Sequence, residues 1–138
     1  MAEFPQEVVC ATSTIHDGNM DFRFGPAEAV LRNRTRFLDT HHILYEDHIA
    51  MRCDHSDIIT LVTSFHPEVG ATSQEEQIES EVLVTQEKNL ALMLFTADCQ
   101  PVSFYDPVTE TIALAHISRR TLIDGLPEKV LQFLKCIL

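Results

Sequence analysis

The stretch ALMLFTADCQPVSFYDPVTETIALAHISRR, residues 91–120, decides the fold because it holds two apolar runs on either side of a turn signal. Between the runs, Asp-Pro is followed by polar residues, which favours a short hairpin with its turn at 107–110. In that register Pro101 lies opposite His116. Cys99 shares the face of Pro101, so its Cβ falls within roughly 8 Å of that of His116. The hairpin therefore predicts a thiol and an imidazole close enough to share a metal ion.

The rest of the chain predicts an α/β fold, a mixed β-sheet with flanking helices. Apolar residues recur at spacings of three and four over 26–39 and 126–138, each with Pro in its first turn, and both segments are predicted as helices. The polar segment 64–80 is predicted as a surface loop with a short helical turn over SQEEQI. The predicted strands are 7–15, 48–63, 81–85, 90–97, 101–106 and 111–117. At 138 residues and 45% hydrophobic composition, residues 1–138 have the size of one domain.

Charge and cysteine content limit the classes of function. The formal net charge is −11, which disfavours binding to nucleic acid or to an anionic membrane surface. No apolar run approaches the length that spans a bilayer. The four cysteines show no CxxC spacing, and no charged leader with an apolar segment precedes them, so we expect a cytoplasmic protein with free thiols. A small-molecule substrate or a protein partner is the favoured class of ligand.

A metal shared by Cys99 and His116 needs a further ligand, because a catalytic zinc usually takes three protein ligands and keeps an open position. Alternation over 48–63 places His55 on the same predicted strand face as Cys53. His66 in SFHPE is a competitor by spacing. A lone Cys or His is more often a buried structural residue than a ligand. On that ground the remaining histidines are predicted to be surface residues: His16, His41, His42 and His48.

Four motifs in order resemble the YfiH-like or laccase-domain family, variously described as multicopper polyphenol oxidase, peptidoglycan editing factor and purine nucleoside phosphorylase. They are DGNM with LRNRTRFL, then MRCDHSD, TADCQP, and AHISRR. The resemblance runs from about residue 11 to the C-terminal end. It implies an α/β sandwich similar to YfiH and to the toxin deamidases.

The resemblance implies a metal site of His55, Cys99 and His116, which sets His66 aside. Zinc is the implied cofactor, with copper as the alternative. Cys99, Asp98 and Arg120 are the implied catalytic residues, with Asp98 orienting a ligand or moving a proton. Asn19, Asn33 and Arg34 are the implied substrate-binding residues, and Arg34 with Arg120 would hold phosphate. From the residues alone, both arginines are equally well interpreted as surface ion-pair partners, and Asp98 as a turn cap.

The sequence also departs from the family pattern. Cys53-Asp54 replaces Gln-Val before the first His, and Ser118-Arg119 replaces Gly-Trp, which removes an aromatic stacking surface. Family members continue well beyond the end of this chain, so one wall of the pocket is absent or is supplied by another subunit, and a homodimer is predicted.

The implied function is zinc-dependent chemistry on purine nucleosides, namely phosphorolysis of adenosine or inosine and deamination of adenosine. One alternative is an amidase or deamidase of the peptidoglycan-editing type, in which His116 activates Cys99 as a nucleophile. Another is a non-catalytic metal-binding module. Multicopper oxidase chemistry is not expected, because such a centre needs more histidines than the seven scattered here.

Overall fold

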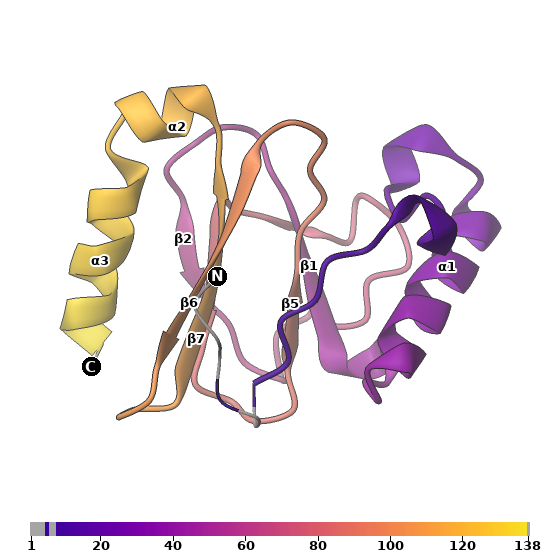
Figure 1. Cartoon of the computed structure of the whole chain (residues 1–138), viewed down its shortest axis with the longest axis horizontal. Coiled ribbons are helices and arrows are strands. Elements are labelled where there is room, and N and C mark those ends of the chain that lie inside the picture. Colours follow the sequence, from indigo (N-terminus) through magenta and orange to yellow (C-terminus); the bar gives the residue numbers. More distant parts are fainter. Residues whose placement is uncertain (1–4, 6–7, 138) are drawn as a thin grey trace.

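The computed structural model describes residue 5 and residues 8–137, and its helices and strands form four layers (Figure 1). From left to right in Figure 1, helix α3 covers one face of a four-stranded sheet, a three-stranded sheet packs on its other face, and helix α1 covers the outer face of the three-stranded sheet. The helices are α1 (Ala27–Thr40), α2 (Arg119–Ile123) and α3 (Leu126–Ile137), with 3-10 turns η1 (Ile15–Asp17), η2 (Phe22–Phe24) and η3 (Tyr45–Asp47). The strands are β1 (His48–Arg52), β2 (Ile59–Leu61), β3 (Ile78–Glu79), β4 (Val82–Thr85), β5 (Ala91–Met93), β6 (Gln100–Asp106) and β7 (Thr111–Ile117).

Both sheets draw on strands that are distant in sequence. The four-stranded sheet has the order β2-β4-β7-β6, in which β2 pairs parallel to β4 while β7 is antiparallel to both β4 and β6. The three-stranded sheet has the order β3-β1-β5, with both pairings parallel. The predicted α/β class with mixed strands and flanking helices is confirmed, although the strands divide between two sheets.

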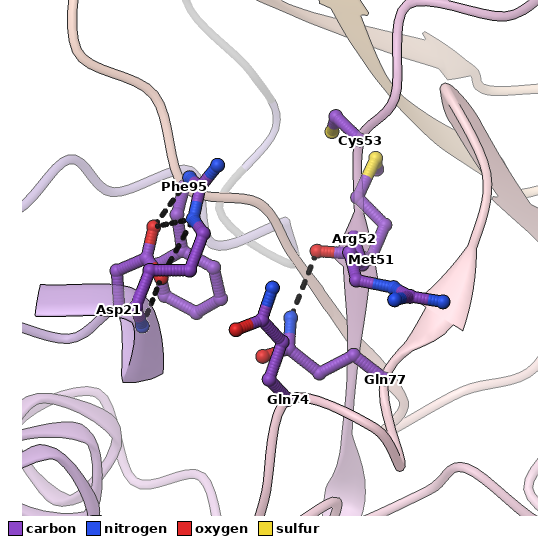
Figure 2. Close-up of a pocket in the computed structure, with 8 residues that line it drawn as sticks. Asp21, Met51, Arg52, Cys53, Gln74, Gln77 and Phe95 are labelled. Carbon is purple, nitrogen blue, oxygen red and sulfur yellow. Dashed lines mark hydrogen bonds and ion pairs between the residues drawn. The ribbon is translucent and has the colours of Figure 1, made fainter.

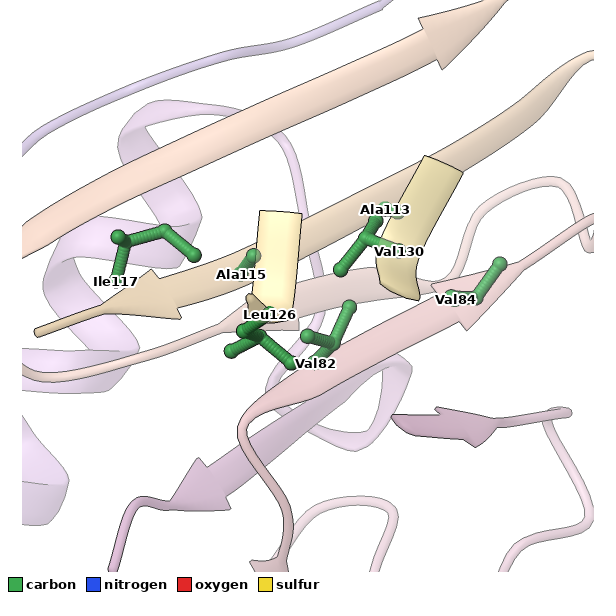
Figure 3. Close-up of a cluster of buried hydrophobic side chains, with 7 residues drawn as sticks. All are labelled: Val82, Val84, Ala113, Ala115, Ile117, Leu126 and Val130. Atoms are coloured by element: carbon green, nitrogen blue, oxygen red, sulfur yellow. The ribbon is translucent and has the colours of Figure 1, made fainter. Parts of the chain in front are cut away.

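Alternation along the strands produces separate cores on the two faces of the four-stranded sheet. Even-numbered residues of β4 and odd-numbered residues of β7 pack against α3 (Figure 3). This cluster consists of Val82, Val84, Ala113, Ala115, Ile117, Leu126 and Val130. The intervening residues Leu83 and Leu114 belong to a second cluster with Ile49 and Met51 of β1. The second cluster therefore fills the layer between the sheets.

Helix α1 packs on the outer face of the three-stranded sheet through Leu38, which clusters with Ala50 of β1 and Met93 of β5. The helix runs from Ala27 to Thr40, within one residue of the predicted segment at each end. In the described part of the chain, no helix is long and apolar enough to cross a membrane.

The predicted hairpin is confirmed, with Pro101 opposite His116 and Asp106 opposite Thr111. The predicted single strand over 48–63 is wrong, because β1 ends at Arg52 and β2 belongs to the other sheet. Between them the Asp54 side chain accepts a hydrogen bond from the backbone N–H of Ser56 (3.0 Å), a local turn that competes with strand pairing.

Three further predictions differ from the structure. Residues 8–14 of the predicted strand over 7–15 join no sheet, while residue 7 lies outside the described residues. The SQEEQI segment forms turns rather than a helix and leads into β3. The short helix α2 was not predicted, and it begins where the Ser118 side chain caps the N–H of Thr121 (3.1 Å).

Candidate metal centre

A buried carboxylate and imidazole face each other at one end of the layer between the sheets. Because Val82 pairs with Ala115 in the antiparallel ladder, Glu81 lies opposite His116, whose N–H donates to the Glu81 carbonyl (2.9 Å). Their side chains are on the same faces as Leu83 and Leu114. His116 Nδ1 lies 2.7 Å from Glu81 Oε2, and the two residues are 4% and 0% exposed. The strand register thus creates a desolvated pair at the end of an otherwise apolar layer.

The second oxygen of Glu81 binds the loop between β1 and β2. Glu81 Oε1 accepts hydrogen bonds from the backbone N–H groups of Asp54 (2.7 Å) and His55 (2.6 Å). His55 has φ of 65°, a left-handed conformation that a residue with a Cβ rarely adopts. Its ring centroid lies 5.3 Å from that of His116, with the planes tilted by 34°. His55 is exposed, so the site has one side open to solvent.

Cys53 and Cys99 are both half-buried, and Cys53 lies next to this pair. The potential ligand atoms of Cys53, Glu81 and His116 all lie within 4.8 Å of one another. Burial, together with the charge of Glu81, raises the pKa of the Cys53 thiol to about 12. Cys99 is close enough for its charge to affect that pKa as well, and it sits in the bend immediately before β6. The bend is held by Thr96, whose hydroxyl donates to the Cys99 carbonyl (2.8 Å).

The donor set fits a zinc ion. Nδ1 of His116 donates a hydrogen bond to the Glu81 carboxylate, so in the neutral ring the proton is on Nδ1 and the lone pair is on Nε2. Nε2 is therefore the atom that could bind a metal. Thiolate and imidazole are the ligands that zinc prefers. The ligand atoms that lie within 4.8 Å of one another belong to Cys53, Glu81 and His116. This group shares only His116 with the ligands inferred from the sequence, His55, Cys99 and His116. That ligand set therefore stays a prediction. Glu81 was missed, since its pairing with β7 has no local signal in the sequence.

Two hollows are lined by residues of this region. His55 lines the larger one, about 360 Å³, together with residues of α2 and α3 and the loop before β2: Ser56, Asp57, Arg120, Asp124 and Lys129. Cys53 lines a narrow hollow of about 10 Å³, room for about one water. Figure 2 shows that hollow, where the Gln77 amide donates to the Met51 carbonyl (3.0 Å) beside the Asp21–Arg23 ion pair.

Arg120 is exposed at the larger hollow, with its side chain 74% accessible and its Nε 3.7 Å from Asp124. Lys129 on α3 forms a hydrogen-bonded ion pair with Asp57 (2.6 Å). The hollow thus carries two cations and two carboxylates next to His55. Asp98 is exposed in the bend that holds Cys99.

Of the predicted substrate-binding residues, Asn33 and Arg34 lie on α1 and Asn19 lies in the loop between η1 and η2. Asn33 donates to the Asn19 carbonyl (2.8 Å), and Asn19 binds the backbone of Asp21 through both ends of its amide. A Cβ at Gly18 would lie 2.7 Å from the Asn33 amide nitrogen, so glycine permits this close approach. Both asparagines therefore hold the N-terminal loop against the helix.

Arg34 is fully buried, and burial lowers its pKa. Its guanidinium lies 4.2 Å from the ring centroids of both Phe22 and Phe95, and its Nε donates to the Met20 carbonyl (2.8 Å). The interpretation of Arg34 as a surface ion-pair partner is wrong. Because Arg34 has no exposed surface, phosphate could reach this guanidinium only if the residues that cover it moved.

Two other histidines show how local context decides their role. His48, predicted to be a surface residue, is fully buried, with its ring centroid 4.5 Å from that of Tyr45. That prediction is wrong because β1 begins at His48 and is covered on both faces. His66, the competitor for the metal, is hydrogen-bonded to Glu68 in its own loop.

His116 is hydrogen-bonded to the buried Glu81 carboxylate, and Cys53 and His55 lie next to it. This is the arrangement of a candidate metal-binding site, so the fold and the site indicate a metal-binding protein. Residues 8–137 match the family described as multi-copper polyphenol oxidoreductase laccase, and the chain belongs to this family. This membership and the structures below confirm the YfiH-like resemblance.

Among similar proteins is a purine nucleoside phosphorylase of Corynebacterium glutamicum, 29% identical over 105 residues, which cover 75% of this chain and 40% of that protein. The structure of YlmD from Geobacillus stearothermophilus aligns with a TM-score of 0.73 and 27% identity, covering 78% of this chain and 41% of YlmD. YfiH from Bacillus licheniformis aligns with a TM-score of 0.66 and 31% identity, covering 70% of this chain and 36% of YfiH. The chain thus spans less than half the length of these relatives.

Proposed function

We propose that the protein is a zinc-dependent enzyme that acts on purine nucleosides, with phosphorolysis of adenosine or inosine as its main reaction. The observation that carries the proposal is the pairing of the His55 and His116 rings at the border of a hollow that also holds Arg120. Relatives named purine nucleoside phosphorylase support the substrate class.

The proposed ligands are His55, Cys99 and His116. Zinc bound there would supply a Lewis acid, or a bound water of lowered pKa, in its open position. Arg120 would bind phosphate, since its planar guanidinium fork matches phosphate oxygens and its exposed side chain lines the hollow. Asp98, in the exposed bend beside Cys99, would move a proton to or from the substrate.

The other parts of the proposal concern the N-terminal side and the assembly. Asn19 and Asn33 shape the loop that would border the nucleoside, while Arg34 anchors that loop from within. A second subunit of a cytoplasmic homodimer would complete the open side of the pocket.

Metal analysis followed by nucleoside turnover tests the proposal. We expect one zinc per chain in the purified protein, phosphate-dependent release of the purine base, and loss of both metal and turnover in His55→Ala and Cys99→Ala. Retention of a full equivalent of metal by both variants would refute the ligand assignment. Full loading without turnover of any nucleoside would refute the enzymatic part.

A non-catalytic metal-binding module is the second candidate, and Cys53 favours it. Its sulfur lies within 4.8 Å of the His116 and Glu81 ligand atoms and could occupy the open position of the metal. Structural zinc sites are closed by four protein ligands, whereas catalytic sites are open. Two zinc–sulfur bonds in X-ray absorption spectra of the loaded protein would support the module, and one would support the enzyme.

A Cys-His amidase is also favoured by one observation, the Glu81–His116 hydrogen bond, because a base held by a third group is the arrangement that activates a nucleophile. Alkylation of Cys99 in a metal-free, active preparation distinguishes it. Abolished amide hydrolysis under those conditions would support the amidase and exclude the zinc enzyme.

A further inference from the structure

We propose that Glu81 is a positioning residue that aligns both His116 and His55 for the metal. The inference rests on the proposed function for the identity of the two ligands. Its physical basis is that one fully buried carboxylate binds both histidines, one through the imidazole and the other through the backbone.

The first half of the argument concerns the ring of His116. An ionised carboxylate can only accept hydrogen bonds, so the proton between His116 Nδ1 and Glu81 Oε2 belongs to the imidazole. The neutral ring then carries its lone pair on Nε2. A carboxylate behind a metal-bound histidine fixes the tautomer and raises the basicity of the ligand.

The second half concerns the backbone of His55. Its φ of 65° is costly by about 1–3 kcal/mol, and such a conformation persists only where neighbouring groups hold it. Glu81 Oε1 is that neighbouring group, since it accepts from the N–H of His55 (2.6 Å) and of Asp54 (2.7 Å). The carboxylate thereby turns the loop so that the His55 ring lies beside that of His116.

These contacts favour positioning over ligation by Glu81 itself. The two carboxylate oxygens of Glu81 already accept three hydrogen bonds, and Glu81 has no exposed surface. Moving Glu81 onto the metal would leave the buried Nδ1–H of His116 unpaired, at a cost of about 1–3 kcal/mol, and would release the N–H groups of Asp54 and His55.

The test is the substitution Glu81→Gln, compared with Glu81→Asp and with Glu79→Gln. In Glu81→Gln the amide oxygen would stay with the two backbone N–H groups, and the amide NH₂ would face His116 Nδ1. The ring would then accept at Nδ1 and carry its proton on Nε2, the wrong tautomer for the metal. Glu79 is an exposed matched control two residues away, ion-paired with Arg52 (2.8 Å).

Two readouts are measured. Nitrogen-15 NMR of the metal-free protein, recorded over a range of pH, reports the tautomer of His116, and competition with a chelator reports zinc affinity. We expect Nδ1–H in the wild type, in Glu79→Gln and in Glu81→Asp, but Nε2–H in Glu81→Gln. Zinc affinity should fall about 10–100-fold in Glu81→Gln and less in Glu81→Asp.

An unchanged tautomer with unchanged zinc affinity in Glu81→Gln would overturn the proposal. Loss of zinc with the wild-type tautomer retained would identify Glu81 as a ligand and overturn it as well. If the wild type binds no zinc while Glu81→Gln still shows the predicted change of tautomer, the proposed metal function is refuted and the role of Glu81 in orienting His116 is supported. Should Glu81→Gln fail to fold, Glu81→Asp decides: affinity equal to that of the wild type would overturn the proposal, and weakened binding would support it.

Discussion

Strands β4 and β7 have two faces that end differently. On the face toward α3, valine, alanine and isoleucine side chains of the two strands cluster with Leu126 and Val130. On the face toward the three-stranded sheet, Leu83 and Leu114 are followed by Glu81 and His116. Both polar residues are buried. The same ladder therefore supports a dry core on one side and a polar pair on the other.

The difference shows how this fold can hold a reactive group without exposing it. A buried carboxylate is costly unless its hydrogen bonds are satisfied, and Glu81 has partners from β7 and from the β1–β2 loop. On the α3 side, the buried cluster is entirely apolar and stabilises the fold through the apolar area that it buries. The two faces should consequently respond to substitution in different ways.

The largest loss of stability is expected from Glu81→Leu, which places an apolar side chain directly before the first residue of β4. It leaves His116 and the N–H groups of Asp54 and His55 without their acceptor, so we expect a loss of about 3–5 kcal/mol in the free energy of unfolding. Chemical denaturation of the metal-free protein measures it. The control Glu79→Leu should change stability little, and equal losses in both variants would contradict the role of the buried contacts.

The next largest loss of stability is expected from Leu126→Ala, which removes a side chain from the apolar cluster between α3 and the four-stranded sheet. Leu126 is fully buried against β4 and β7, so its truncation should cost about 2–5 kcal/mol through lost burial and a cavity. Thermal and urea unfolding provide the measurement, with Leu131→Ala on the half-exposed side of α3 as the matched control. Zinc affinity of the folded fraction should stay at the wild-type value; a drop parallel to stability would show that the two faces are not independent.

A smaller effect is expected at the rim of the larger hollow. Arg120→Ala should raise the KM for phosphate about tenfold, equivalent to about 1.4 kcal/mol, while unfolding stays within about 0.5 kcal/mol of the wild type. Steady-state kinetics with inosine and varied phosphate measure it. Arg119→Ala is the control, because Arg119 is exposed on the same helix but does not line the hollow. An equal change in both variants would point to general charge rather than to a phosphate contact.

Local signals in the sequence predicted the parts of the fold that depend on near neighbours. The helical spacing over 26–39 and 126–138 corresponds to α1 and α3, and the Asp-Pro turn set the register that places Pro101 opposite His116. The alternation of apolar and polar residues over 48–63 gave a wrong prediction of one continuous strand. A turn at Asp54–Ser56 divides this segment between β1 and β2, which belong to different sheets.

Glu81 could not be predicted, because its partner in the ladder is 35 residues away and that register depends on packing between layers. Likewise, the burial of Arg34 depends on Phe22 and Phe95, which reach it from separate segments. The pairing of Cys99 with His116 was predicted from the hairpin register, and the family motifs added His55 as the third ligand. The ligand role of all three residues is still a prediction.

Zinc stoichiometry of Cys99→Ser beside Cys53→Ser tests the central claim most directly. The Cys53 sulfur lies in ligand range of His116, and Cys99 is close enough to Cys53 for its charge to affect the pKa of Cys53, but only Cys99 belongs to the proposed ligand set. The account predicts that Cys53→Ser retains one zinc per chain and that Cys99→Ser loses it. Zinc retained by Cys99→Ser and lost from Cys53→Ser would contradict the account and assign the metal to Cys53, Glu81 and His116.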